Sequence, residues 1–299
     1  MKNTRILVIL SFIAIYVIWG STYLLNKVIV TEVAPLYLAS IRFITAGILL
    51  FGICFLLKKP LQIKWREFAN TTIAGFLFLT FGNGVFVWAL KYVDSGFAAL
   101  EASLQSLIIL LLLWAIDGKK PQKKSLVGIA LGLIGMYLLV NQKSILINKD
   151  SLLGIFMILS CIICWSFASI FVSKASLPKN LLVSSSYQML AAGIMLLGVS
   201  YCFKETWLPI QNWSTESHLS MLLLITLGSI VAFTAFNYLL KTVSPEKVAT
   251  SAYVNPVIAL SLGWYFLNET ITTQSIIAAV ILLTGVYFIN SSKKAKEKN

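Results

Sequence analysis

Two ionisable residues lie well inside apolar stretches of this sequence, and they are its clearest candidates for chemistry. Arg42 follows Pro35 by seven residues, and Glu101 lies about six residues into the apolar run that begins near Ser95. At a helical rise of 1.5 Å per residue, both lie roughly 9–10 Å deep from the same side. A charged side chain at the bilayer centre costs about 2.5–3.5 kcal/mol, so it normally faces a partner or water.

Two interpretations of these residues stay open. In the first, Arg42 and Glu101 form an interhelical pair that holds the second and fourth spans together. In the second, the planar guanidinium of Arg42 binds a substrate carboxylate or phosphate through parallel donors. Glu101 then takes a substrate amine or a coupling proton, and it is the proton-coupling candidate because no other carboxylate lies well inside a span.

Polar and aromatic residues at helical spacing supply further candidates for a cavity. Trp19 and Tyr23 share one helix face, and their rings offer stacking surface for an aromatic or cationic solute. Helix packing or an interfacial aromatic belt explains the same residues equally simply. The full set of binding or cavity candidates is Trp19, Tyr23, Arg42, Asn83, Trp88, Glu101, Trp165, Gln188, Asn237, Tyr253 and Asn255.

The elements that position these residues are predicted to be membrane helices. The chain has 299 residues, of which 58% are hydrophobic and only 12% are charged, whereas globular proteins carry about 25% charged residues. Its apolar runs are about twenty residues long, which is the length that spans a bilayer. They predict an all-α integral membrane protein with ten transmembrane helices, near 6–28, 35–57, 68–90, 95–116, 125–141, 152–172, 182–203, 219–240, 245–267 and 273–290.

The placement of Lys and Arg residues predicts the orientation of the chain. Eighteen of them fall at the termini and in the loops of one side, whereas five fall on the other side. By the positive-inside rule, both termini of this multi-pass protein are cytoplasmic, in an inner or plasma membrane. The net charge of +13 therefore reflects topology, and the basic tail at 291–299 is expected to contact anionic lipid rather than nucleic acid.

The two halves of the chain resemble each other. A shift of 150 residues places Trp114 on Trp264 and Gly135 on Gly285, and a shift of 146 residues places Trp19 on Trp165. The expected domains are a first five-helix repeat at 1–141 and a second at 152–290. Because each repeat has an odd number of spans, the second is inverted, which is the usual architecture of alternating-access transporters.

Few residues are available for metal, cofactor or enzyme chemistry. Cys161 and Cys164 have the spacing of a redox motif but lie on a membrane helix, and the single histidine, His218, lies in a polar loop. No phosphate-binding loop of the GxxxxGK[ST] kind is present. We therefore expect a transporter without cofactor or metal rather than an enzyme, working as a monomer on a small-molecule substrate, in contact with lipid and with a coupling proton. A membrane channel, or a membrane-embedded enzyme acting on lipid-linked groups, remains the alternative.

Several short motifs together resemble the EamA-type transporters of the drug/metabolite transporter superfamily. They are Ile18–Thr22, Arg42–Phe43, Gly96–Leu100, Val248–Pro256 and Trp264–Glu269, in that order along the chain. The resemblance covers about residues 6–290 and implies a secondary transporter with five plus five helices. It implies alternating access around a central cavity and export of small metabolites such as amino acids or drug-like compounds.

Two positions depart from the pattern of that family. Ser106 stands where the second half has Pro256, and Lys119 stands where it has Glu269. Since proline interrupts a helix, the first departure predicts that the fourth span is straighter than the ninth.

Overall fold

The computed structural model describes residues 2–118, 122–140 and 149–291, and every regular element in these ranges is a helix. Long apolar runs favour helix in a bilayer, because a helix satisfies the hydrogen bonds of its own backbone within the segment. Beyond Ser291, the basic tail predicted at 291–299 lies outside the described residues.

The helices coincide with the ten predicted segments. Each segment is either one helix or a stack of shorter ones: α1 (Lys2–Val30), α2 (Pro35–Leu56), α3 (Trp65–Gly75) with η1 (Phe76–Asn83) and α4 (Gly84–Ala89), α5 (Ser95–Ala102) with α6 (Gln105–Asp117), α7 (Lys123–Val140), α9 (Lys149–Lys174), α10 (Leu181–Cys202), α11 (Thr215–Leu223) with η3 (Leu224–Phe233) and α12 (Thr234–Thr242), α13 (Pro245–Val248) with η4 (Ala249–Tyr253) and α14 (Asn255–Leu267), and α15 (Thr273–Ser291). A short 3-10 turn, η2 (Ile210–Asn212), precedes α11.

Seven of these segments are long and apolar enough to cross a membrane, within the described residues. They correspond to the first four, the sixth, the seventh and the eighth predicted spans. The tenth, at Thr273–Phe288, is a shorter apolar helix. The fifth, ninth and tenth spans therefore stay predictions, although each of them is helical.

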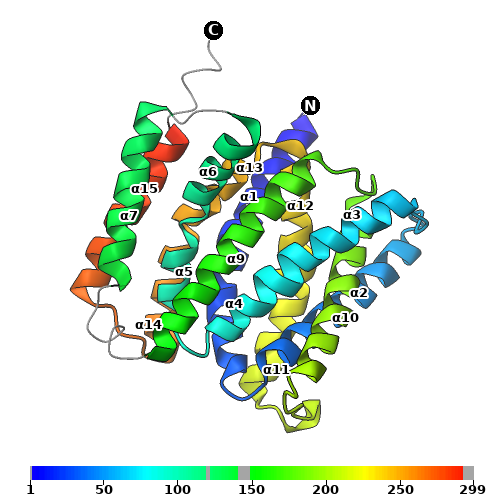
Figure 1. Cartoon of the computed structure of the whole chain (residues 1–299). Coiled ribbons are helices and arrows are strands. Elements are labelled where there is room, and N and C mark those ends of the chain that lie inside the picture. Colours follow the sequence, from blue (N-terminus) through cyan, green and yellow to red (C-terminus); the bar gives the residue numbers. More distant parts are fainter. Residues whose placement is uncertain (1, 119–121, 141–148, 292–299) are drawn as a thin grey trace.

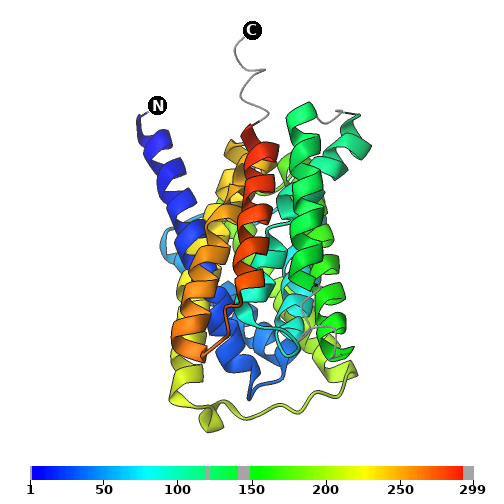
Figure 2. The same ribbon diagram turned by 90° about the vertical axis from the view of Figure 1, so that its left-hand side faces the viewer.

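The helices form one bundle in which related segments of the two halves lie side by side. Helix α7 packs along α15 at one edge of the bundle, and α2 packs along α10 at the other (Figure 1). Helices α1 and α9 lie between these two edges in this view. Both ends of the chain lie at the same end of the bundle in two perpendicular views (Figure 2).

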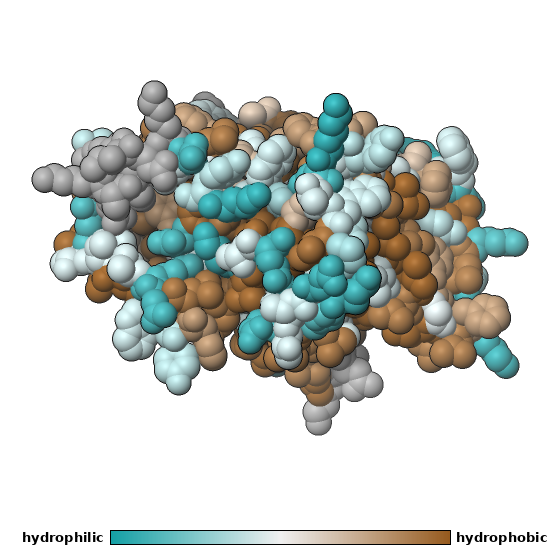
Figure 3. Space-filling model, turned by 90° about the horizontal axis from the view of Figure 1, so that it is seen from below, coloured by the Kyte–Doolittle hydropathy of each residue, from teal (hydrophilic) through white to brown (hydrophobic). Residues whose placement is uncertain are grey.

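The opposite end of the bundle carries the loops that precede α2, α5 and α11. Hydrophilic residues gather over the middle of this end, and hydrophobic residues show between and beside them (Figure 3). We refer to this end, away from both termini, as the far end.

The helix-end geometry repeats between the two halves. Within the described residues, the residues with positive φ are Lys58 and Lys204, which are 146 positions apart, and Gly118 and Asn268, which are 150 apart. Each ends a helix in the left-handed conformation that closes a helix C-terminus. These separations are the same two shifts that align the sequences of the halves, so the local folding signals repeat with them.

Several of the predicted spans are interrupted or distorted along their length. The segments that carry α3 and α11 each contain a π-helix, η1 and η3, and such distortions cluster at functional sites. The fourth predicted span is broken between α5 and α6, as the ninth is at η4. Both spans are interrupted, over two residues in the fourth and over η4 in the ninth, so the expectation of a straighter fourth span stays a prediction. The break in the fourth span contains no proline, and beside it the Ser106 hydroxyl bonds the carbonyl of Ala249 in the ninth span.

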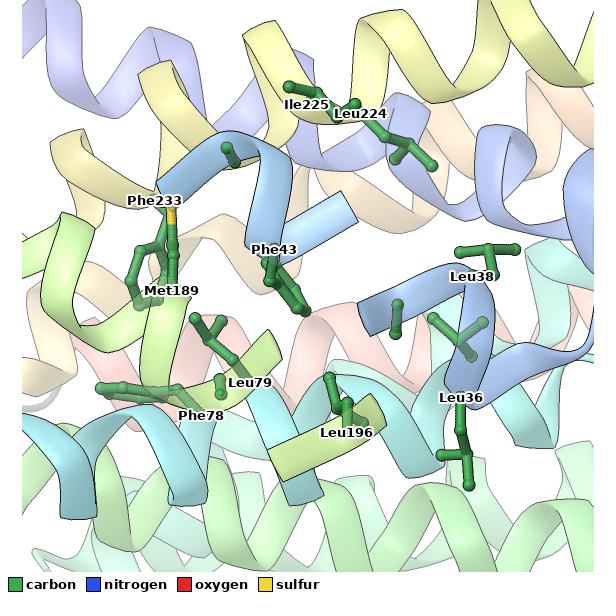
Figure 4. Packing of buried hydrophobic residues seen from close by; sticks show 14 of the residues in the cluster. Leu36, Leu38, Phe43, Phe78, Leu79, Met189, Leu196, Leu224, Ile225 and Phe233 are labelled. Atoms are coloured by element: carbon green, nitrogen blue, oxygen red, sulfur yellow. The ribbon is translucent and has the colours of Figure 1, made fainter. Parts of the chain in front are cut away.

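The largest apolar cluster joins both halves. Phe43 of α2, Phe78 of η1 and Phe233 of η3 are almost fully buried within it, at 1%, 0% and 2% exposure. Met189 and Leu196 of α10 contribute from the second half (Figure 4). This core fixes α2, η1 and η3 against one another and so positions the polar residues that lie beside it.

Candidate functional site

A cavity of about 120 Å³ lies in the middle of the bundle, between the two halves. Its walls come from α1, α2, η1, α4, α5 and α6 in the first half and from α9, η3, α12, α13, η4 and α14 in the second. Six of the residues singled out from the sequence line it: Trp19, Tyr23, Arg42, Asn83, Trp165 and Asn255. The structure thus brings together residues that are up to 236 positions apart in the chain.

Arg42 is the only charged residue among those that line the cavity. Its side chain is 3% exposed, its Nε donates a 2.8 Å hydrogen bond to the Ser229 hydroxyl, and its Nη1 lies 3.5 Å from Oδ1 of Asn26. Within the described residues, no carboxylate pairs with it. A buried guanidinium with unused donors can bind an anion, because charge-assisted hydrogen bonds would then compensate its charge.

The amide of Asn26 is held in place for this contact. Its Nδ2 donates a 2.7 Å hydrogen bond to the carbonyl of Thr22, one turn earlier in α1. That bond turns Oδ1 toward Arg42. Asn26 and Ser229 therefore orient the guanidinium from opposite halves of the chain without neutralising it.

Asn83 supplies an acceptor to the same cavity. It ends the π-helix η1, and its buried Oδ1 has no hydrogen-bond partner among the described atoms. An unpaired buried acceptor costs about 1–3 kcal/mol. A donor group on a solute, such as an amine or a hydroxyl, would satisfy it.

The rest of the wall is aromatic. Trp19 and Trp165 meet edge to face with ring centroids 5.7 Å apart, and both rings contact Phe236, at 4.8 and 5.8 Å. Trp19 Nε1 donates to the carbonyl of Gly228 in η3 at 3.2 Å, and a Cβ on Gly82 of η1 would lie 3.0 Å from the Trp165 ring. The two tryptophans thus occupy matching places against the two π-helices.

Glu101 lies outside this wall. It is fully buried in α5, and neither carboxylate oxygen has a hydrogen-bond partner in the described part of the chain. Its neighbours along the chain, Ala102 and Gln105, do line the cavity. The interhelical pair with Arg42 is therefore not formed in this arrangement, because Arg42 bonds to Ser229 and Asn26 instead.

Three other candidates lie elsewhere. Gln188 and Asn237 bond each other at 3.4 Å and are buried among serines between α10 and α12. Trp88 lines a depression at the far end, where its ring meets Phe203 edge to face. The backbone of Tyr253 belongs to η4, but its side chain lies outside the described part of the structure.

No set of three or more His, Cys, Asp or Glu side chains with the arrangement of a metal site occurs within the described residues. The cavity offers hydrogen-bond donors, acceptors and aromatic faces, so what it can do chemically is bind a small solute.

Comparison with known protein families decides the class of this protein. The profile of the EamA-like transporter family matches residues 6–141 and again residues 152–291. The chain belongs to the EamA-like transporter family. The resemblance noted from the sequence motifs is thereby confirmed.

Individual relatives of this EamA-like protein are transporters by name. An inner membrane transporter, YedA, of Escherichia coli strain K12 is 34% identical over 287 residues, which cover 95% of this chain and 90% of that protein. A protein of Salmonella typhimurium named "Probable amino-acid metabolite efflux pump" is 25% identical over 91% of each chain. A solved crystal structure of a protein 18% identical superposes with a TM-score of 0.71 over 97% of this chain and 98% of that one, which shows that the fold is shared.

These comparisons make the EamA-like protein a multi-pass, helical membrane transporter. They give the cavity its context, because a transporter needs a solute site within the bundle. They do not bear on individual residues, and the assignment of the site rests on the geometry above.

Two features of the site were not found from the sequence. Ser229, the main partner of Arg42, is 187 residues away from it and stands in an apolar run without any motif. Gly228, which accepts the bond from Trp19, carries a signal that was overlooked: it aligns with Gly82 at the shift of 146 residues that aligns Trp19 with Trp165.

Proposed function

We propose that this protein is a secondary transporter that exports small metabolites such as amino acids or drug-like compounds by alternating access around the central cavity. The observation that carries the proposal is the buried guanidinium of Arg42, which faces the cavity without a carboxylate partner in the described residues. A carboxylate of the protein itself, paired with Arg42, would occupy the site permanently. A transported solute must be able both to bind there and to leave.

The proposed machinery is a pair of inverted five-helix repeats, 1–141 and 152–290, which together give ten spans. Support comes from the sequence shifts of 146 and 150 residues, the matched helix ends, and the paired π-helices η1 and η3. An odd number of spans per repeat places both termini in the cytoplasm when the Lys and Arg bias is taken into account. The far end of the bundle then faces the outside.

The proposed solute carries an anionic group and an apolar or aromatic body. Arg42 binds its carboxylate or phosphate, Asn83 accepts a bond from its amine or hydroxyl, and the rings of Trp19 and Trp165 contact its body. The efflux pump named for Salmonella typhimurium supports amino acids and related metabolites as a first set to test. We propose further that the protein works as a monomer in contact with membrane lipid.

Glu101 is the proposed site of the coupling proton. It is buried next to Ala102 of the cavity wall, and its oxygens have no hydrogen-bond partner among described atoms. A carboxylate in such surroundings gains or loses a proton at a free-energy cost that depends on whether the cavity beside it is hydrated.

The test is exchange of labelled solute in proteoliposomes. Purified protein is reconstituted with unlabelled amino acids, carboxylated metabolites or phosphorylated metabolites inside, and uptake of the labelled form is followed. Saturable uptake that requires the same solute on the opposite side supports a carrier. Flux that rises linearly with concentration indicates a channel, and chemical conversion of a lipid-linked group indicates an enzyme.

A further inference from the structure

The first helix of the fourth span is capped by a carboxylate from the other half of the chain. Glu269, two residues past the end of α14, accepts hydrogen bonds from the backbone N–H groups of Ser95 at 2.8 Å and Gly96 at 3.0 Å. Gly263 of α14 makes room for it, because a Cβ at this position would overlap the Glu269 carboxylate. An ionised carboxylate on helix amino-terminal amides makes strong, charge-assisted bonds, so this contact holds α5 to α14.

A second carboxylate, that of Asp94, lies at the same end of α5. Asp94 occupies the N-cap position of α5, where aspartate usually accepts a bond from the helix's own N2 or N3 amide, but it makes no such bond here. The N2 amide, that of Gly96, is bonded to Glu269. The amine of Lys27, in α1, holds the turn that precedes α5 by donating hydrogen bonds to the carbonyls of Leu90 and Val93.

Partial burial and the nearby Glu269 carboxylate disfavour the ionised form of Asp94 in this arrangement. Partial burial raises the pKa of Asp94 above its ordinary value, the Glu269 carboxylate raises it further, and Lys27 opposes both. An N-cap bond would favour the ionised form. Asp94 therefore gains from any rearrangement in which it replaces Glu269 on the helix amides.

The residue types that make this contact are not repeated in the sequence of the other half. At the shift of 150 residues, Lys119 replaces Glu269 and Pro245, which has no N–H, replaces Ser95. The N-cap of α13, Ser244, makes no side-chain cap bond either. The contact is thus a feature of one end of the transporter.

The contact lies between the cavity and the far end. Along α14, Asn255 lines the cavity and Gly263 lies two turns closer to the far end; along α5, Ala102 lines the cavity and Ser95 lies at the far end. The two helices approach closely here, since a Cβ on Gly96 would lie 2.6 Å from the Leu260 side chain. Separating α5 from α14 at this level would open the cavity toward the outside.

We propose that Glu269 and Asp94 exchange as the cap of α5 when the outer end of the cavity opens. In the closed arrangement Glu269 caps α5 and holds it to α14. When the two helices separate, Asp94 accepts the hydrogen bond from the N2 amide, that of Gly96, so that the opening does not leave this amide unpaired. This inference rests on the proposed function, because it takes the two halves as the moving parts and the far end as external.

Glu205 caps a different helix, α2, in the same way, but no second carboxylate lies at the N-cap position there. Its carboxylate caps α2 by accepting bonds from the N–H groups of Leu36 and Tyr37, at 3.2 and 2.9 Å. The N-cap residue there is Ala34, which has no side-chain acceptor. Because α2 and α10 pack along each other over their length, this cap is expected to stabilise the fold without controlling access to the cavity.

The test uses Cys161, which lines the cavity and is 3% exposed, as a reporter. Cys54, Cys164 and Cys202 are replaced by alanine in the full-length protein, and the rate of Cys161 labelling by a membrane-impermeant maleimide is measured from the outside and from the inside of oriented vesicles. Loss of two charge-assisted bonds shifts an equilibrium by at least about tenfold. We expect Glu269→Gln to raise the outside rate by about that factor, Asp94→Ala to lower it, and Glu205→Gln to leave it unchanged.

A second variant guards against a folding defect. Gly263→Ala displaces the Glu269 carboxylate without changing any charge, and it is expected to raise the outside rate as Glu269→Gln does. The proposal is overturned if both variants label no faster than the parent, if Asp94→Ala also labels faster, or if Cys161 reacts only from the cytoplasmic side in every variant. Solute binding that persists in Arg42→Gln, with the labelling pattern intact, would instead support the cap exchange and remove the proposed binding site.

Discussion

Replacing Arg42 by glutamine separates a binding role from a structural one, because the two roles predict opposite balances of stability and affinity. The guanidinium makes one short hydrogen bond, to Ser229 at 2.8 Å; the contact with Asn26 at 3.5 Å is at the limit of a hydrogen bond. Losing the short bond costs about 1.5–3 kcal/mol, since one partner is charged. Removing a buried charge that lacks a partner also removes its desolvation penalty. That penalty is on the order of several kcal/mol, which equals or exceeds the cost of the lost hydrogen bond.

We therefore expect Arg42→Gln either to change the free energy of unfolding by less than about 2 kcal/mol or to increase it. Binding of an anionic solute should weaken by about 2–5 kcal/mol, the usual effect of truncating one partner of a buried charge pair. That loss is roughly 30-fold to several-thousand-fold in Kd, at 1.4 kcal/mol per factor of ten.

The assay is thermal unfolding of the purified protein with and without carboxylated or phosphorylated solutes. A ligand at 100 times its Kd adds about 2.7 kcal/mol to stability, so the melting temperature of the wild type should rise and that of Arg42→Gln should not. Gln188→Leu is the matched control, because Gln188 aligns with Arg42 in the second half but bonds Asn237 away from the cavity. It should lower stability and leave the solute-induced shift intact.

The reasoning would be refuted by the reverse pattern. If Arg42→Gln unfolds more than about 3 kcal/mol more easily, as expected for breaking a buried pair, and solutes still shift its melting temperature, then Arg42 is a structural residue.

Three further predictions concern the same bundle. Glu101→Gln should abolish the pH dependence of solute exchange in proteoliposomes, and an unchanged pH profile would exclude it as the coupling site. Gly228→Ala should weaken solute binding about tenfold, because its Cβ would lie 3.2 Å from Nη2 of Arg42, whereas Gly52→Ala, with nothing within 4 Å, should not. Asp94→Asn should raise the melting temperature at neutral pH and lose this advantage in acid. The raised pKa of Asp94 means that the folded state binds its proton more tightly than the unfolded state, so stability falls as pH rises through that pKa. A gain in stability that persists at low pH would contradict this account.

Periodicity and hydrophobicity predict the helical segments well here, because each long apolar run must satisfy its own backbone within a bilayer. Arg42 also stood out from the sequence alone, since a charge at that depth demands an explanation. The site partners were out of reach for a physical reason. Ser229 and Glu269 act across the bundle on residues 187 and 174 positions away, and no local pattern records such a contact.

The interruptions of the helices show a different limit. The proline rule located the break before α14, but it missed the break before α6, where the Ser106 hydroxyl bonds the carbonyl of Ala249 in the ninth span. Serine inside a helix gives a weak signal because it is also compatible with an unbroken one. Likewise, Gln188 and Asn237 satisfy each other, which their positions in the sequence do not reveal.

The central claim is that an anionic solute binds in the cavity at Arg42, between the two halves. An experimental structure of the full-length protein with a carboxylated solute that stabilises it tests this claim most directly. We predict the carboxylate within hydrogen-bond distance of the Arg42 guanidinium and the body of the solute against Trp19 and Trp165. A solute bound outside this cavity, or Arg42 paired with Glu101 while the solute is bound elsewhere, would contradict the account.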